Sequence, residues 1–186
     1  MIEANFPLLS LIIVIPLLGA VLAGSIRNND ISKQIAFFIA LFTLLLTIFA
    51  LLLFDADKSD FQLVERYPWI PILNIEYLVG VDGISVLFLP MTAIVTIITM
   101  LASWNAISHS SRFHFALLLA LEGISIGIYC ALDTVLFFLF WELTLPPFFF
   151  LIGLWGIGSQ RRSAAMKYTL FTVSYTHLTL PTNREV

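Results

Sequence analysis

Residues 134–158 read TVLFFLFWELTLPPFFFLIGLWGIG, and this stretch decides the class of fold. Glu142 is its single ionisable side chain. With a rise of about 1.5 Å per residue, a helix of this length crosses the roughly 30 Å hydrocarbon core of a bilayer. The stretch therefore predicts a membrane-spanning helix.

The composition extends that prediction to the whole chain of 186 residues. Hydrophobic residues make up 60% of it, charged residues only 11%, and the mean hydropathy is +0.99, far from the values of a soluble domain. Nine Lys and Arg against twelve Asp and Glu leave no basic patch, so we expect no binding to nucleic acid. A single cysteine excludes a disulfide-stapled secreted module.

Four further apolar blocks are long enough to cross a bilayer. Residues 4–26 and 34–54 contain no formal charge, as do residues 83–108, while residues 113–132 are interrupted only by Glu122. A cleavable signal peptide is the alternative for the first block. It fits poorly, because Glu3 stands where a basic segment belongs and the apolar stretch is too long. We therefore expect an all-α, polytopic transmembrane bundle of five complete spans.

The orientation follows from the number of Lys and Arg in alternate loops. The loops after the first, third and fifth spans carry six, and the other side carries only Lys58 and Arg66. The six are Arg27, Lys33, Arg112, Arg161, Arg162 and Lys167. This asymmetry predicts that the short basic loops lie in the cytoplasm and the N-terminus outside.

The long loop of residues 55–82 is predicted to be an extended, hairpin-like strap on the outside. It contains the sequence Tyr67-Pro68-Trp69-Ile70-Pro71, which is too rich in proline for a helix. At its end, Asp82 is placed to cap the first amides of the third span.

The end of the chain departs from the spanning pattern. A sixth span begins near Tyr168, but residues 174–186 are rich in threonine, contain Pro181 and end in polar residues, so they cannot complete it. We interpret 174–186 as an artefactual tail resembling vector read-through. The predicted organisation is then 1–82 for two helices and the external loop, and 83–173 for spans three to five with the start of the sixth.

Two carboxyl groups lie inside predicted spans, where an ionisable group is costly and is a functional hypothesis by default. Glu122 precedes Asp133, the expected turn between spans four and five, by eleven residues, and Glu142 follows it by nine. Both therefore lie about 13 to 17 Å from that turn, near the middle of the membrane. The spacing sets their depth and leaves open whether they face each other.

Pro146 and Pro147 follow Glu142 at four and five residues. Their missing amides free the carbonyl groups of Glu142 and Leu143, so the helix should break or kink here. Carbonyl groups without helical donors, beside a protonatable acid, can bind water inside an apolar bundle. Glu142 is therefore the predicted proton relay, and Glu122 a candidate accessory proton site.

Other candidates for chemistry are weaker. His109 and His114 are too isolated for a metal site, and Cys130 is expected to be a small apolar filler. Phosphate loops, dinucleotide fingerprints and haem or iron-sulfur ligand sets are missing from the sequence. We expect no cofactor-binding and no metal-binding residue in this chain.

The sequence from Leu136 to Pro147, continued by Phe150-Leu151-Ile152-Gly153-Leu154-Trp155-Gly156, resembles the fifth span of the antiporter-like subunit M (chain 4) of respiratory complex I. Three further motifs match in register. They are Gly80-Val81-Asp82-Gly83-Ile84-Ser85, Leu132-Asp133, and Ala164-Ala165-Met166-Lys167-Tyr168. Pro146 departs from the family pattern, in which an aliphatic residue precedes the single proline matched by Pro147.

The resemblance implies a membrane-arm subunit of proton-pumping NADH:quinone oxidoreductase, located in the cell inner (plasma) membrane. It implies that Glu142 relays protons and that the partners are other membrane-arm subunits, with NADH, FMN, iron-sulfur clusters and quinone bound by partner subunits. In the family, the lysines that work with this glutamate lie in spans seven and eight. The chain reaches only the start of span six, the N-terminal part of a longer antiporter-like fold, so we do not expect it to pump alone.

Two alternatives remain open on the sequence. The same architecture serves multisubunit cation/proton antiporters and membrane-bound hydrogenases, so a subunit of one of these is the alternative function. A passive membrane scaffold, in which Glu142 only holds neighbouring helices together, is the other.

Overall fold

The computed structural model describes residues 6–58, 60–73, 75–107 and 109–178. The chain divides into two compact units, residues 1–144 and residues 145–186, and each is described by itself. Five helices are long and apolar enough to cross a membrane among the residues described, which confirms the five expected spans.

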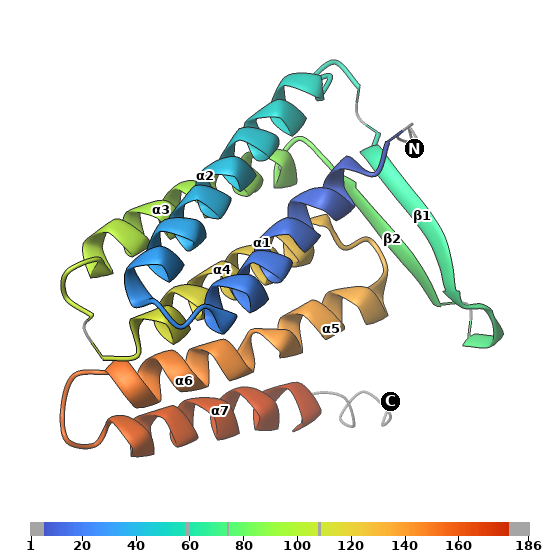
Figure 1. Ribbon diagram of the computed structural model, residues 1–186. Coiled ribbons are helices and arrows are strands. Elements are labelled where there is room, and N and C mark those ends of the chain that lie inside the picture. The colour runs from blue at the N-terminus through green and yellow to red at the C-terminus, as the bar shows by residue number, and fades with distance from the viewer. Residues whose placement is uncertain (1–5, 59, 74, 108, 179–186) are drawn as a thin grey trace. The chain divides into compact units, whose positions relative to one another are not determined.

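The described residues of the first unit form five α-helices, and the first four lie side by side (Figure 1). They are α1 (Leu8–Ser25), α2 (Asn29–Leu53), α3 (Ser85–Ser103), α4 (Ser111–Cys130) and α5 (Thr134–Leu143). Helix α4 packs against all the others, and most of its residues are buried. A polytopic protein places such a helix at the centre of its bundle, where it is shielded from lipid.

Two glycines allow the close packing of α4. A Cβ atom on Gly123 would lie 2.8 Å from the carbonyl oxygen of Ile13 in α1, and one on Gly127 would lie 2.6 Å from the ring of Phe140 in α5. Small residues at such crossings let helix backbones approach each other in a membrane. Larger side chains at either position would push α1 or α5 away from α4.

The loop between α2 and α3 forms an antiparallel β-hairpin, as expected. Strand β1 (Gln62–Ile70) pairs with β2 (Ile75–Val81), and the short 3-10 helix η1 (Pro71–Leu73) lies in the connection. The hairpin lies at the end of the unit where α1 begins (Figure 1). It is tied to the end of α4 by the amide of Leu132, which donates to the carbonyl of Leu78 at 2.9 Å, and by a bridge between Val79 and Ala131.

Asp82 caps α3 as predicted. Its carboxylate accepts hydrogen bonds from the amides of Ile84 at 3.2 Å and Ser85 at 2.7 Å. The Ser85 hydroxyl in turn accepts from the Asp82 amide at 2.9 Å. The two residues therefore satisfy donors at the start of this helix reciprocally.

The second unit is a helical hairpin of α6 (Leu145–Trp155) and α7 (Arg161–Leu178). The turn includes Gly158, whose φ of +106° is in a region that side chains rarely adopt. Helix α7 starts earlier than the expected position near Tyr168 and continues to Leu178, past the predicted boundary at 174. Residues 179–186, which make up most of the predicted tail, lie outside the described residues.

Candidate functional site

Glu142 lies at the C-terminal end of α5, one residue before the helix ends. The other end of α5 is capped by Asp133, whose carboxylate accepts from the amides of Val135 at 2.9 Å and Leu136 at 3.0 Å. This cap starts the helix at Thr134, and Glu142 is the ninth residue after Asp133. The position of the Asp133 cap thus sets how far Glu142 lies from the start of α5.

The membrane-length segment Thr134–Trp155 is interrupted directly after Glu142. Helix α5 ends at Leu143, Thr144 forms a turn, and α6 starts at Leu145. The carbonyl of Trp141 accepts two hydrogen bonds from Thr144, from its amide at 3.1 Å and from its hydroxyl at 2.7 Å. This local bonding replaces the regular helical pattern at the break.

The two prolines occupy the first turn of α6, a position where proline is tolerated because the missing amide has no helical partner. Proline at 146 and 147 cannot donate to the carbonyls of Glu142 and Leu143. Within the described chain, the Glu142 carboxyl makes no hydrogen bond or ion pair, and the side chain is partly exposed. The acid therefore lies partly exposed beside a break in a membrane-length segment.

Glu122 has a different environment in the middle of α4. Its side chain is 1% exposed, and neither carboxyl oxygen has a hydrogen-bond partner among the described residues. It lies in an apolar stripe with Phe115, Leu119 and Ile126, all fully buried. A carboxylate without partners is expensive in such a place, so the neutral acid is the form that fits.

A second buried carboxyl group, that of Glu65, was not expected from the sequence. It is 4% exposed and belongs to β1, yet it binds the start of α1. Its carboxylate accepts from the amide of Leu9 at 2.6 Å and from the amide of Ser10 at 3.2 Å, and also from the Ser10 hydroxyl. The Tyr77 hydroxyl in β2 lies 2.9 Å from the same Ser10 oxygen.

An irregularity in the hairpin explains why Glu65 points inward. Leu63 has a positive φ of 53°, and the register shifts between Gln62 and Glu65. As a result, the consecutive residues Val64 and Glu65 are both buried, at 3% and 4% exposure. Regular strand alternation places consecutive residues on opposite faces, so no signal in the sequence marks Glu65 as buried.

The remaining polar candidates form no centre. Among the described residues, no group of three or more His, Cys, Asp or Glu side chains could hold a metal ion. Cys130 is fully buried in the apolar core, as a small filler would be. His114 belongs to the first turn of α4 and is also buried.

Residues 131–179 match a family model described as NADH:quinone oxidoreductase/Mrp antiporter, TM. This matched region contains Glu142 and both prolines. The chain is 37% identical over 166 residues to F(420)H(2) dehydrogenase subunit M of Methanosarcina mazei, an alignment that covers 89% of this chain and 33% of the relative. It is 38% identical over 175 residues to NAD(P)H-quinone oxidoreductase chain 4 of Synechococcus sp., covering 92% of this chain and 31% of that protein.

The fold has a solved counterpart in the membrane-bound sulfane sulfur reductase, an archaeal respiratory membrane complex. One chain of that complex superimposes with a TM-score of 0.73 at 24% identity, covering 93% of this chain and 26% of the other. The chain spans about a third of the length of the two curated relatives named above. The family model and the relatives together show that residues 131–179 carry the transmembrane domain of the NADH:quinone oxidoreductase/Mrp antiporter family, and that the chain is homologous, over that third of their length, to proteins named chain 4 or subunit M.

Proposed function

We propose that the chain is part of a membrane-arm subunit of a proton-pumping NADH:quinone oxidoreductase, and that Glu142 takes up and releases the translocated proton. The observation that carries the proposal is the position of Glu142, directly before the break at Thr144 in a membrane-length segment that matches the family model. The relatives named for quinone oxidoreductase and F(420)H(2) dehydrogenase favour redox-driven translocation over a subunit of a separate cation/proton antiporter.

The break supplies what a proton relay needs. The carbonyls of Glu142 and Leu143 cannot receive the usual helical donors, because the residues four positions later are prolines. We infer that water bound to those carbonyls exchanges protons with the carboxyl, which makes no hydrogen bond or ion pair in the described chain. A group held by fixed hydrogen bonds exchanges protons poorly, so this freedom supports the relay against the scaffold.

Glu122 is proposed as an accessory proton site. Its carboxyl is buried without a hydrogen-bond partner among residues that the structure describes. It lies beside the crossing of α4 with α1, where Pro16 removes a helical donor in α1. A neutral acid stored there can ionise only when water or a cation reaches it. Its contribution should therefore be smaller than that of Glu142, which adjoins the break.

The electron-transfer chemistry belongs to other chains in this proposal. NADH, FMN, the iron-sulfur clusters and quinone are bound by partner subunits, and neighbouring membrane-arm subunits and the lipid bilayer contact this chain. The subunit lies in the cell inner membrane with its N-terminus outside. The concentration of Lys and Arg in the loop after α1 and in the first two turns of α2, α4 and α7 supports this orientation.

The test is Glu142→Gln in the full-length subunit, assembled in its complex and reconstituted in vesicles. Proton uptake and NADH oxidation are measured on the same sample, and the ratio of protons to electrons is the readout. We expect the ratio to fall close to zero in Glu142→Gln and to recover in Glu142→Asp, which restores a carboxyl. The Glu122→Gln variant should retain most of the ratio.

An unchanged ratio in Glu142→Gln would support the scaffold instead. Translocation that proceeds in the purified assembly without any redox partner would support the separate antiporter.

A further inference from the structure

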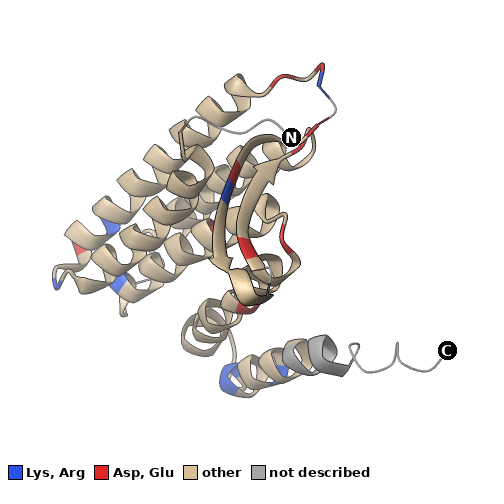
Figure 2. Ribbon diagram, turned by 90° about the vertical axis from the view of Figure 1, so that its right-hand side faces the viewer, with Lys and Arg blue, Asp and Glu red and all other residues tan. Residues whose placement is uncertain are grey.

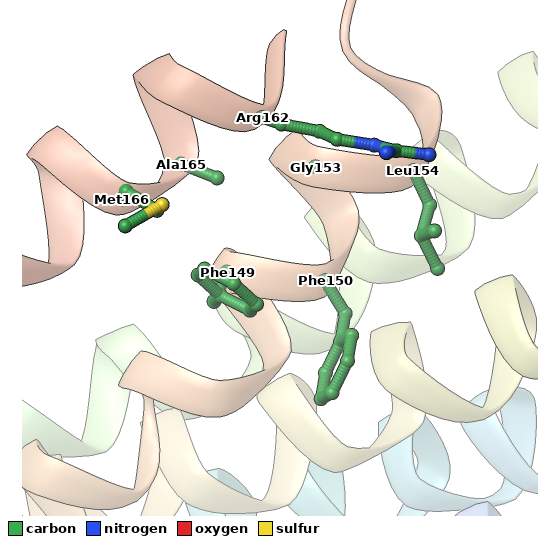
Figure 3. Close-up of a pocket in the computed structure, with 7 residues that line it drawn as sticks. All are labelled: Phe149, Phe150, Gly153, Leu154, Arg162, Ala165 and Met166. Atoms are coloured by element: carbon green, nitrogen blue, oxygen red, sulfur yellow. The ribbon is translucent and has the colours of Figure 1, made fainter.

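Helices α6 and α7 enclose an apolar groove of about 340 Å³. Figure 3 shows the residues that line it: Phe149, Phe150, Gly153 and Leu154 on α6, and Ala165 and Met166 on α7, with Phe149 on the side of Met166. The helices approach closely at one point, where a Cβ on Gly153 would lie 3.6 Å from the Ala165 Cβ. The cavity is within the size range of ligand sites and has an almost wholly apolar wall.

Arg162 is the only charged residue that lines the groove in the described structure. Its side chain extends from α7 across the edge of the groove toward α6 (Figure 3). The guanidinium makes no hydrogen bond or ion pair within the described chain. It is therefore free to bind an anion at the mouth of an apolar cavity.

The surrounding charges favour an anionic ligand. Residues 145–178, the described part of this unit, contain Arg161, Arg162 and Lys167 and not one Asp or Glu. The cations belong to the first two turns of α7, next to the loop that follows a membrane-length segment. Such a basic cluster at the end of a span lies at the level of the lipid headgroups.

We propose that this groove binds an anionic phospholipid, with its phosphate on Arg162 and one acyl chain against Phe149, Leu154 and Met166. A planar guanidinium binds phosphate oxygens in a bidentate manner, and an acyl chain matches the apolar wall. A soluble anion uses only the guanidinium, and an apolar tail without a phosphate leaves the guanidinium unpaired. A phospholipid uses both parts of the site.

The experiment uses the full-length protein, purified from nanodiscs that contain equal amounts of phosphatidylglycerol and phosphatidylcholine. Native mass spectrometry then counts each lipid retained per protein. We expect the wild type to retain phosphatidylglycerol preferentially, and Arg162→Gln to weaken that retention by about tenfold, the effect of losing a charge-assisted hydrogen bond. Arg112→Gln, which removes an exposed arginine at the start of α4, is the matched charge control.

A second variant tests the acyl part of the site without changing charge. Met166→Trp fills the groove from a residue that is 56% exposed, so it can be accommodated without disturbing the helix contact at Gly153. It should also lower retention, whereas Ile98→Trp, at an exposed apolar position in α3, should not. Circular dichroism confirms that each variant is folded.

Three outcomes would overturn the proposal. Equal retention in wild type and Arg162→Gln would show that the arginine binds no headgroup, as expected if a later segment of the subunit fills the groove. An equal loss in Arg112→Gln would show only general attraction to the surface. Loss in Arg162→Gln without any loss in Met166→Trp would indicate a free-anion site. None of these results bears on Glu142, because proton translocation is measured separately.

Discussion

The two ends of the first unit differ in how they satisfy the ends of their helices. Helices α1, α3 and α5 begin at the hairpin end, and each has a carboxylate on its first amides: Glu65 on α1, Asp82 on α3 and Asp133 on α5. Figure 2 shows acidic residues gathered around this end. A negative charge at a helix N-terminus interacts favourably with the helix dipole.

The opposite end uses neutral and cationic groups. Helix α2 is capped by the side-chain amide of Asn28, although Asp30 lies in its first turn, and α4 begins without a side-chain cap. The Lys33 ammonium donates to the carbonyl of Trp104 at the end of α3, at 3.0 Å, and lies 5.9 Å from the ring centre of Phe115. Acids bind helix starts at one end and a lysine binds a helix end at the other. The distribution of charges therefore stabilises the helices at both ends of the unit.

The largest expected loss of stability comes from removing Glu65, which caps α1 from a distant part of the chain. Glu65→Ala leaves the amides of Leu9 and Ser10 buried without acceptors, so we expect the free energy of unfolding to fall by about 1–3 kcal/mol. Thermal unfolding of the full-length protein in nanodiscs measures this change. Glu76→Ala, which removes an exposed pair with Arg66 on the same hairpin, should cost at most about 1 kcal/mol. Equal losses in the two variants would contradict a special role for Glu65.

A smaller effect is expected at the local cap of α3. Asp82→Ala removes the acceptor of the Ile84 and Ser85 amides, which are accessible to water, so the loss should be about 1 kcal/mol. Asp82→Asn keeps an acceptor and should recover most of it. The same unfolding assay applies. If Asp82→Ala lost more unfolding free energy than Glu65→Ala, the prediction that Glu65 contributes more stability than Asp82 would be wrong.

The contributions of Glu65 and Asp82 to stability should change with pH in opposite directions. Each change should be smaller than the loss on truncation to Ala, because titration leaves the side chain and its hydrogen-bond partners in place. Burial raises the pKa of Glu65 above 4.5, and the hydrogen bonds from Ser10 and Leu9 oppose the rise only in part. Its contribution to stability is therefore full below pH 4.5 and is lost as pH rises through the folded-state pKa. Hydrogen bonds from the amide and side chain of Ser85 lower the pKa of Asp82 below 3.8, so its contribution is present above pH 3.8 and is lost as pH falls through the folded-state pKa.

Melting temperatures of wild type, Glu65→Gln and Asp82→Asn across the acidic range measure this difference. The advantage of wild type over Glu65→Gln should shrink as pH rises, and its advantage over Asp82→Asn should shrink as pH falls. Parallel curves for the two variants would show that both carboxylates have the same environment.

The smallest effect is expected from changing the neutral cap at the other end. Asn28→Asp places a negative charge on the first amides of α2, where Asn28 accepts from Asp30 at 3.0 Å. The helix should gain up to about 0.5 kcal/mol from the dipole, reduced by repulsion from Asp30. A loss of stability in Asn28→Asp would contradict this expectation and would show that the start of α2 requires a neutral cap.

Sequence reasoning predicted the parts of this comparison that are local in the chain. The Asp82 cap follows from one carboxylate two or three residues before the amides it binds, and the hairpin follows from a proline-rich loop between two spans. The Glu65 cap joins residues 56 positions apart, and its direction depends on the irregular backbone at Leu63. Strand alternation alone cannot reveal such a contact.

The sequence by itself determined the five membrane-length helices, because their length and lack of charge are properties of consecutive residues. It also showed which two acids lie within them. The break after Glu142 was expected from the two prolines that follow it, whereas only the tertiary structure decided that Glu122 is enclosed without a hydrogen-bond partner among the described residues. The difference arises because Gly123 and Gly127 let neighbouring helices close over α4, whereas the residues after Glu142 cannot continue its hydrogen bonding.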